Sequence, residues 1–546
     1  MPNNDTWWVK WRFDLAHHWR FGLVLAGLLI GFEMLMAGVF ILITPHGQQW
    51  LGSMVFNAFD QAVYLNYLLQ GKDGLSIYNL FNDLPQVPRF DVFWSTGGLL
   101  VKAGLSPILT HEILRWLMTM VLAFAVFATA KSLFIEERKA RLSSLLMLSG
   151  LSLGTIYAGW RDLGGPKIQT TGPLPPDLVT EFGIAPIPVA GAHIILSVAL
   201  EILVVRWIYE LICLGERKRL APCFLAALVF SWLHPYFIAL MGCQLALCLV
   251  AAARNGRFKT SVMPFLIVCL SLVPSTIYHS WLAYQDRAFK VHFLDVNVLP
   301  LGSPWGWLFT LLPLLWALGY AFFRRQAVAE HRPADIRWVW YWIVSAVICI
   351  LLPFPWKRKY TQGLLMAGVI LTLPYWLMVC GWLRARWKTG VKHLLLLFCF
   401  LLFAVSPYLY LFVLEFETTA PIYSLRFYQG ADLMEAWRQI RNSPGPDMLL
   451  TDNFIINLWV PAQTGKHVWV GHSHETPNYS IRFKEYADWL GTQDPIKFNR
   501  YLDQNPITRF IVTERKNIIR FETMIDRQNW ERMFSQGSVA VWTKRR

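Results

Sequence analysis

A single carboxylate stands among aromatic and aliphatic residues in the stretch "VFNAFDQAVYLNYLLQG", which covers residues 55–71. An amphipathic helix of a soluble protein carries several charges on its polar face, whereas this stretch carries only Asp60. One interpretation is a helix at the membrane surface with one solvated acid. The other is a carboxylate that faces a cavity at the boundary of lipid and water, where it serves as a general base or binds a metal. On both interpretations five side chains are expected along the membrane: Phe56, Phe59, Tyr64, Leu65 and Leu68.

Three consecutive cations, Lys357, Arg358 and Lys359, occur in "PFPWKRKYTQG" between two apolar runs. On the topology derived below they lie on the outer side, against the usual preference of cations for the cytoplasmic side. They either contact anionic lipid headgroups or bind the phosphate of a lipid-linked ligand. The second role is favoured, with Arg358 as the main contact, because a guanidinium can donate two parallel hydrogen bonds to one phosphate.

Two histidine-containing motifs could also carry chemistry. His234 lies in "SWLHPYF", beside a proline that interrupts an apolar run, and a structural role is the simpler interpretation there. His472, His474 and Glu475 lie in "GHSHET", directly after a predicted strand. The H-x-H-E spacing is compatible with zinc, but no third histidine or cysteine follows at a familiar spacing. We therefore favour a polar loop that faces a substrate over a plain surface turn or a metal site.

Other ionisable residues are weaker candidates. The glycine- and proline-rich stretch "GWRDLGGPKIQTTGPLPPD" contains Arg161, Asp162 and Lys167, which could line an acceptor channel on a mobile loop. Ionisable residues at membrane depth are costly, so each one there is a functional hypothesis by default. The apolar runs contain three of them: Glu33, Glu201 and Arg206.

The composition places these residues in a membrane protein. Of 546 residues, 55% are hydrophobic and only 16% are charged, so one soluble core could not bury the apolar surface. The formal charge of +15 would indicate nucleic acid in a soluble protein. Here the basic residues cluster just outside apolar runs, so topology explains them and no nucleic-acid partner is expected. The eight cysteines lie in or beside apolar runs without a CxxC pair, which predicts buried thiols rather than disulfides or metal ligands.

Apolar runs close to the length that crosses a bilayer, about 20 residues, recur between residues 20 and 414. They predict an α-helical polytopic membrane protein. One long run is divided at His234-Pro235, because proline favours a helix break there. We predict about eleven spans: 20–44, 112–134, 142–159, 190–213, 221–234, 237–253, 261–281, 304–323, 337–354, 362–383 and 393–414.

The basic clusters predict the orientation of these spans. With every span counted, the clusters share one side, which is the cytoplasm by the positive-inside rule. The transmembrane domain is then residues 1–414, with the N-terminus inside and with outer loops at 45–111 and 160–189. The tail, residues 415–546, lies outside, and its alternating strand and helix patterns predict a small α/β domain. Its last strand pattern, "GSVAVWTK", alternates as an edge strand does.

Two segments and this layout resemble the GT-C superfamily of integral membrane glycosyltransferases, which use polyprenyl-phosphate-linked sugars. "FDQAVYLNYLLQGKDG" is similar to the "D-x-x-x-Y-L…G" opening of bacterial members of this group. "WVPAQTGKHVWVGHSHET" is similar to a later "P-x-x-x-G-x-x-V-x-x-G-H-x-x-E-T" segment. The matching layout extends over nearly the whole chain: a first span, an outer loop with a helix-borne acid, many spans and an outer domain.

The resemblance implies that Asp60 is the catalytic base. Many members carry two adjacent acids, but Gln61 follows Asp60 here, so the sequence gives no support for a divalent metal or another cofactor. The implied partners are a lipid-linked sugar donor, membrane lipids, and a glycan, lipid or protein acceptor. The implied location is a bacterial-type inner membrane with the tail in the periplasm. The expected substrate-lining residues are Tyr64, Arg161, Asp162, His234, His472, His474 and Glu475.

Two rival functions remain from the sequence. A transporter or flippase of lipid-linked saccharides would show repeat symmetry and paired broken helices with little outer mass. The chain shows no internal repeat and carries a long polar tail, which disfavours that reading. A membrane subunit that borrows the fold without catalysis is the other rival, because a fold does not fix a function.

Overall fold

The computed structural model describes residues 7–52, 58–84, 86–153, 190–290, 304–323, 335–353, 356–386, 427–445 and 447–545. The chain divides into two compact units. The first, here the helical unit, comprises residues 1–34, 115–279 and 298–414. The second, here the mixed unit, comprises residues 35–114, 280–297 and 415–546. This division differs from the domain boundaries expected from the sequence, because residues 35–114 and 280–297 group with the tail.

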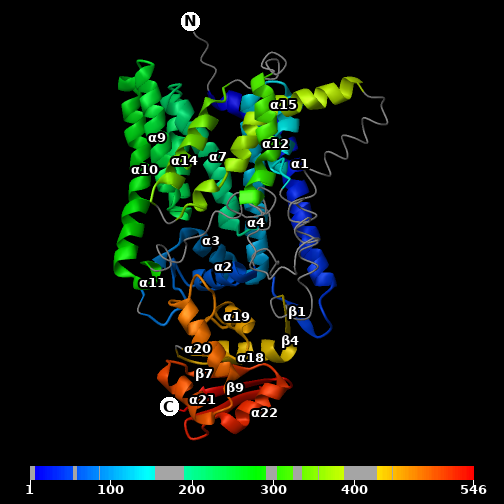
Figure 1. Ribbon diagram of the computed structural model, residues 1–546, viewed down its shortest axis with the longest axis vertical. Helices are drawn as coiled ribbons and strands as arrows, with labels where there is room; N and C mark the ends of the chain where they lie inside the picture. Colours follow the sequence, from blue (N-terminus) through cyan, green and yellow to red (C-terminus); the bar gives the residue numbers. More distant parts are fainter. Residues whose placement is uncertain are drawn as a thin grey trace. The chain divides into compact units, whose positions relative to one another are not determined.

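The helical unit is built from apolar helices that cluster around α7 (Ala192–Ile212) (Figure 1). This helix is predominantly apolar and most of its residues are buried, and it packs against α8 (Leu220–Leu233), α9 (Phe237–Arg254) and α14 (Arg337–Leu351). A helix of that kind must be buried in protein or lipid. The other helices that contribute to this unit are α1 (Trp7–Leu42), α4 (Pro107–Leu133), α5 (Glu137–Ser149), α8 (Leu220–Leu233), α9 (Phe237–Arg254), α10 (Phe258–Gln285), α12 (Pro304–Phe323), α14 (Arg337–Leu351) and α15 (Leu364–Arg386), with short 3₁₀ turns at Arg217–Arg219 and Lys359–Thr361.

By length and composition, these helices make the chain a membrane protein. Five stretches within the described residues are long and apolar enough to cross a bilayer: Trp19–Leu42, Pro107–Leu133, Phe237–Arg254, Phe258–Gln285 and Lys359–Trp382. Two shorter apolar helices, Gly306–Tyr320 and Arg337–Leu351, accompany them. The larger set of about eleven spans therefore stays a prediction, and its last member, 393–414, lies outside the described residues.

Two of the predicted span boundaries can be compared with the helices directly. The break at His234-Pro235 is confirmed, because α8 ends at Leu233 and α9 begins at Phe237. Proline has no amide hydrogen to continue the helical hydrogen bonds. The span expected at 142–159 can be compared only in its first part, because residues 154–159 lie outside the described residues. Its helix, α5, ends at Ser149 because Gly150 adopts a left-handed φ of 74°.

The mixed unit contains a five-stranded sheet in the order β6-β5-β7-β9-β8. The first three strands are parallel, and the last two are antiparallel to their neighbours. The bounds are β5 Met448–Thr451, β6 His467–Val468, β7 Arg509–Val512, β8 Trp530–Gln536 and β9 Val539–Lys544. The predicted α/β tail is therefore correct in kind. The assignment of "GSVAVWTK" as an edge strand is wrong, because β9 pairs with β7 on one side and β8 on the other.

Alternation along the strands places two apolar cores on opposite faces of this sheet. Leu450 and Phe510 belong to one core, while Leu449 and Ile511 belong to the other. Helices α20 (Tyr479–Gly491), α21 (Pro495–Gln504) and α22 (Arg515–Met524) supply the first core. Helices α18 (Ala431–Asn442) and α19 (Phe454–Thr464) supply the second. The unit is thus a layered α/β structure with helices on both faces.

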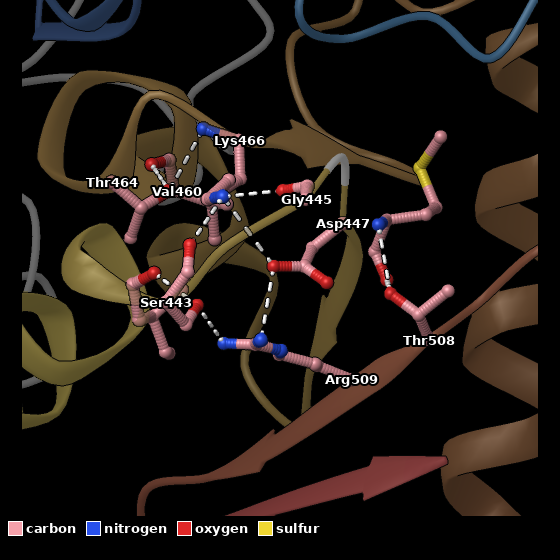
Figure 2. Close-up of polar contacts among 10 residues, drawn as sticks. Ser443, Gly445, Asp447, Val460, Thr464, Lys466, Thr508 and Arg509 are labelled. Carbon is pink, nitrogen blue, oxygen red and sulfur yellow. Dashed lines mark hydrogen bonds and ion pairs between the residues drawn. The ribbon is translucent and has the colours of Figure 1, made fainter. Parts of the chain in front are cut away.

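The amino-terminal ends of β5 and β7 are joined by a buried ion cluster (Figure 2). Asp447 Oδ2 lies 3.1 Å from Arg509 Nη2 and 3.6 Å from Lys466 Nζ. Arg509 Nη1 donates a hydrogen bond of 2.6 Å to Ser443 Oγ, and Lys466 Nζ donates to the carbonyls of Ser443 and Gly445. One carboxylate thus serves as the shared counter-ion of two largely buried cations, and the cluster links the starts of β5, β6 and β7.

The remaining described elements of the mixed unit are short strand pairs and helices outside the five-stranded sheet. Strand β1 (Gln48–Trp50) pairs with β4 (Tyr428–Gly430), and β2 (Ser76–Ile77) pairs with β3 (Arg89–Phe90). Helices α2 (Ala58–Gly71), α3 (Val92–Lys102) and the four-residue α11 (Arg287–Lys290) complete it. The pairing of β1 with β4 shows that residues after the first long helix and residues before α18 form one structure.

Candidate functional site

Helix α2 carries Asp60 and packs between two other helices, α3 and α19. The contact with α3 is close, because a Cβ atom at Gly98 would lie 2.1 Å from the backbone carbon of Gly71. Tyr64, Leu65 and Leu68 are buried in this packing. The expectation that they lie along the membrane is therefore wrong: their apolar character serves a protein core. Phe56 lies outside the described residues, as does the side chain of Phe59.

A short segment before α3 docks along β6 and connects the first half of the chain to the tail. The amide of Val468 donates a hydrogen bond of 2.9 Å to the carbonyl of Leu80. His467 Nδ1 lies 2.7 Å from the carbonyl oxygen of Asn82. Arg482 Nη2 donates to Asp83 Oδ1 at 2.6 Å, and its guanidinium lies 3.8 Å from the ring of Trp469. This docking brings the loop after β6 to α2.

As a result, Asp60 and His472 contact each other directly. His472 Nε2 lies 2.9 Å from Asp60 Oδ1, although the two residues are 412 positions apart. The His472 side chain is 6% exposed, whereas that of Asp60 is 41% exposed. The carboxylate therefore remains accessible from outside while a buried imidazole holds one of its oxygens.

The hydrogen bonds of His472 indicate which ring nitrogen carries the proton. The backbone amide of His474 donates to Nδ1 at 3.2 Å, so Nδ1 accepts in the neutral ring and Nε2 donates to Asp60. Burial lowers the pKa of His472, but the hydrogen bond to Asp60 and the charges of Asp60 and Glu475 raise it more, so the net pKa lies above its usual value. In both protonation states the imidazole is a donor to the carboxylate.

The other residues of "GHSHET" lie beside this pair. The ring centroid of His474 lies 5.6 Å from that of His472. Glu475 is buried, and its backbone carbonyl accepts a hydrogen bond of 2.9 Å from Asn79 Nδ2. Tyr67 on α2 is not among the residues predicted from the sequence. Burial and the negative charge of Glu475 raise the pKa of the Tyr67 hydroxyl, so the Tyr67 side chain stays protonated.

Gln61, next to Asp60, is engaged elsewhere. It is buried, and its Nε2 donates to the carbonyl of Gly52 and lies 3.3 Å from His111 Nδ1. His111 is also buried and lies 3.7 Å from a carboxylate oxygen of Glu112. His111 is not predictable as a site residue, because a lone histidine beside an apolar run resembles a core residue. Among the described residues, no group of three or more His, Cys, Asp or Glu side chains is arranged to hold a metal ion.

The cations of "PFPWKRKYTQG" belong to the helical unit, at the turn between α14 and α15. Lys357 is exposed, while Arg358 and Lys359 are half-buried. Lys359 Nζ lies 5.9 Å from the centroid of the Tyr236 ring, and that ring meets Trp356 at 5.3 Å. The turn thus places three cations next to two aromatic rings.

His234 and the buried acid Glu201 border this turn. His234 is buried and stacks on His193 with centroids 5.4 Å apart. Gln362, which follows the turn, donates through Nε2 to Ser197 Oγ at 2.8 Å and to Glu201 Oε2 at 3.1 Å. Trp342 Nε1 donates to Glu201 Oε1 at 2.9 Å. Glu201 therefore joins α7, α14 and the start of α15.

The remaining ionisable candidates have structural partners or lie elsewhere. Arg206 forms an ion pair with Glu210, one helical turn away, at 2.6 Å. Glu33 accepts a hydrogen bond of 2.8 Å from Thr119, and Arg115 lies 3.8 Å from its other oxygen. These contacts tie α1 to α4. Arg161, Asp162 and Lys167 lie outside the described residues, so their proposed role stays a prediction.

The fold and these contacts define a helical membrane protein with a mixed α/β unit that contains an accessible carboxylate held by a buried histidine. The chain is similar in structure to the oligosaccharyltransferase of Archaeoglobus fulgidus, solved while tethered through a disulfide bond to an acceptor peptide with the NVT sequon. The TM-score is 0.43 at 10% sequence identity, and the match covers 92% of this chain and 69% of that chain. A likeness at this level carries no argument about activity. No family model and no curated protein matches the chain.

Proposed function

We propose that this protein is a membrane glycosyltransferase that moves a sugar from a polyprenyl-phosphate-linked donor to an acceptor hydroxyl, with Asp60 as the general base. The observation that carries the proposal is the contact between the exposed carboxylate of Asp60 and the buried ring of His472. The motif resemblance reported above adds to it, because both residues lie in its two segments.

The chemistry requires a base with this accessibility. The acceptor loses its proton to Asp60 while the acceptor atom forms a bond to the anomeric carbon of the sugar. The bond between that carbon and the phosphate oxygen breaks, and its electron pair leaves with the polyprenyl phosphate. A hydrogen bond from His472 Nε2 fixes one oxygen of Asp60 and so orients the carboxylate. Fixed orientation of a reacting group lowers the entropic part of the barrier.

The leaving phosphate needs positive charge more than it needs an acid, because it is stable as an anion. Lys357, Arg358 and Lys359 are the residues we assign to it in the helical unit. Their turn is held by Gln362, which donates to Ser197 and Glu201. The aromatic rings of Tyr236 and Trp356 next to Lys359 suit the isoprenoid end of such a donor.

The test separates transfer from transport. The purified protein is placed in liposomes with polyprenyl-phosphate-linked sugars that carry a labelled sugar, and a panel of glycan, lipid and peptide acceptors is added. A glycosyltransferase releases polyprenyl phosphate and labels an acceptor, which chromatography of the lipid and water phases detects. A flippase moves the intact lipid across the bilayer without release of polyprenyl phosphate. That second result, or the absence of both activities, contradicts the proposal.

A further inference from the structure

A cavity of about 320 Å³ opens in the helical unit where α7 ends and α10 begins. Its polar lining consists of Arg217, Arg257 and Thr260. Two glycines, Gly215 and Gly256, shape its rim with left-handed φ values of 76° and 71°. A larger residue at Gly215 would be strained and would place its Cβ 3.1 Å from the guanidinium of Arg257. The cavity is therefore built from two tight turns that present arginines.

The charge around this cavity is one-sided. The nearby acids are already engaged: Glu210 pairs with Arg219 at 2.6 Å, and Glu216 pairs with Lys218 at 3.1 Å. Arg257 Nη1 donates to the carbonyl of Cys213 at 2.8 Å, which fixes the guanidinium without neutralising it. Among the residues that the structure describes, three further cations have no carboxylate within ion-pair distance: Arg217, Arg254 and Lys259.

An exposed apolar stripe begins beside this cavity. Pro264 of α10 lines the cavity, and the residue that precedes it, Met263, is 63% exposed. Side chains spaced by three or four residues continue the stripe along α10: Leu266, Leu270, Val273, Ile277 and Trp281. Such spacing places them on one face of the helix. A cationic cavity and an apolar helix face thus lie next to each other.

The geometry points to a binding site for an anionic phospholipid, whose phosphodiester headgroup enters the cavity between Arg217 and Arg257 and whose acyl chains lie along α10. Basic pockets between membrane helices bind lipid headgroups in this way. The general preference of cytoplasmic loops for cations explains the sign of the charge. It does not explain a cavity lined by two arginines and a threonine hydroxyl.

The experiment measures lipid binding to the full chain by native mass spectrometry in a mild detergent. The ligands are dioleoylphosphatidylglycerol, the zwitterionic dioleoylphosphatidylcholine, and sodium phosphate. The test variant combines Arg217→Ala with Arg257→Gln, since glutamine can still donate to the carbonyl of Cys213. Arg217→Ala alone is a second variant, because Arg217 has no side-chain partner among the described residues and its loss should not disturb folding. The matched control is Arg20→Ala with Arg138→Ala, which removes two exposed charges away from the cavity.

We expect the wild type to retain phosphatidylglycerol in preference to phosphatidylcholine. The double variant should lose at least about tenfold in affinity for it, and Arg217→Ala alone about threefold or more, while the control keeps wild-type affinity. Equal binding of the two lipids by the wild type overturns the inference, as does an unchanged affinity in both cavity variants. Binding of sodium phosphate that excludes the lipid overturns the lipid assignment.

Discussion

The contact between Asp60 and His472 is a single hydrogen bond that joins the first outer loop predicted from the sequence to the tail. The backbone amide of His474 donates a hydrogen bond to Nδ1 of His472, and Nε2 of His472 donates one to the carboxylate of Asp60. Because both ring nitrogens already have partners, this geometry predicts that His472 orients the carboxylate. Asp60, whose side chain is 41% exposed, is the member of the pair that is accessible from outside.

Replacement of His472 should change how stability depends on pH. The pKa of His472 is raised above its ordinary value of 6.5, so the protonated ring favours the folded state. That contribution is complete below the ordinary value and is lost as the pH rises through the raised one. His472→Gln keeps an N–H donor but does not titrate. We expect the wild type to exceed this variant in thermal stability more at about pH 5.5 than at about pH 8.5.

The measurement is thermal unfolding of the purified full chain across that pH range. His472→Leu is the companion variant: because it removes the donor at every pH and does not titrate either, it should be about 1 kcal/mol less stable than His472→Gln throughout. A difference between wild type and His472→Gln that is flat with pH, or that grows as the pH rises, would contradict the assignment.

Asp447 should be the most sensitive acid of the sheet. Asp447→Asn keeps the shape of the side chain but leaves Arg509 and Lys466 buried without a counter-charge. Breaking a buried pair in this way costs about 3–5 kcal/mol. Limited proteolysis in increasing denaturant measures the loss, with the exposed Asp488→Asn as the control. Equal resistance of the two variants would show that the cluster adds no net stability.

At the scale of elements, the turn that carries Lys357, Arg358 and Lys359 depends on a glycine. Gly363 has a φ of 74°, and a Cβ there would lie 2.3 Å from the ring of Trp342. Gly363→Ala should therefore destabilise the helical unit by about 1–3 kcal/mol, through backbone strain and a steric clash. The thermal midpoint of the purified protein reports the loss.

Gly381→Ala is the matched control for this prediction. Gly381 lies within α15, the helix that begins directly after Gly363, and a Cβ there meets nothing within 4 Å. Alanine in an open helical position should be neutral or stabilising by up to about 1 kcal/mol. If the two variants have the same thermal midpoint, the backbone conformation of Gly363 does not constrain the turn.

Particular elements show what the sequence could and could not predict. The proline after His234 predicts the helix break, and the apolar runs predict the helices. Both signals are local, because each depends only on residues that are neighbours in the sequence. Strand β8 is not predictable from its sequence "WERMFSQ", which lacks a regular alternation of polar and apolar residues, and the inner position of β9 depends on that partner. Asp60, His472 and Glu475 were each singled out by type. Their proximity was not predictable, because it depends on the docking of residues 79–83 along β6. Tyr67 and His111 were missed because they resemble core residues.

At the scale of the whole molecule, the distribution of basic loops predicts that residues 415–546 lie outside the cytoplasm. Alkaline phosphatase folds to an active enzyme only outside the cytoplasm. Green fluorescent protein that is exported in an unfolded state fluoresces poorly outside the cytoplasm. A phosphatase fused after Arg546 should therefore be active, and a fluorescent protein at the same position should be dark. The reverse pattern would invert the orientation and place Asp60 on the other face.

The central claim is that Asp60 removes the acceptor proton, and Asp60→Asn tests it most directly. Asparagine keeps the size of the side chain and can still accept a hydrogen bond from His472, but it is not a base. We expect the release of polyprenyl phosphate to fall by about 10²–10⁴-fold, while circular dichroism and donor binding match the wild type. Asp73→Asn, an exposed acid after the same helix, should retain full activity. Turnover by a folded Asp60→Asn protein near the wild-type rate would contradict the account.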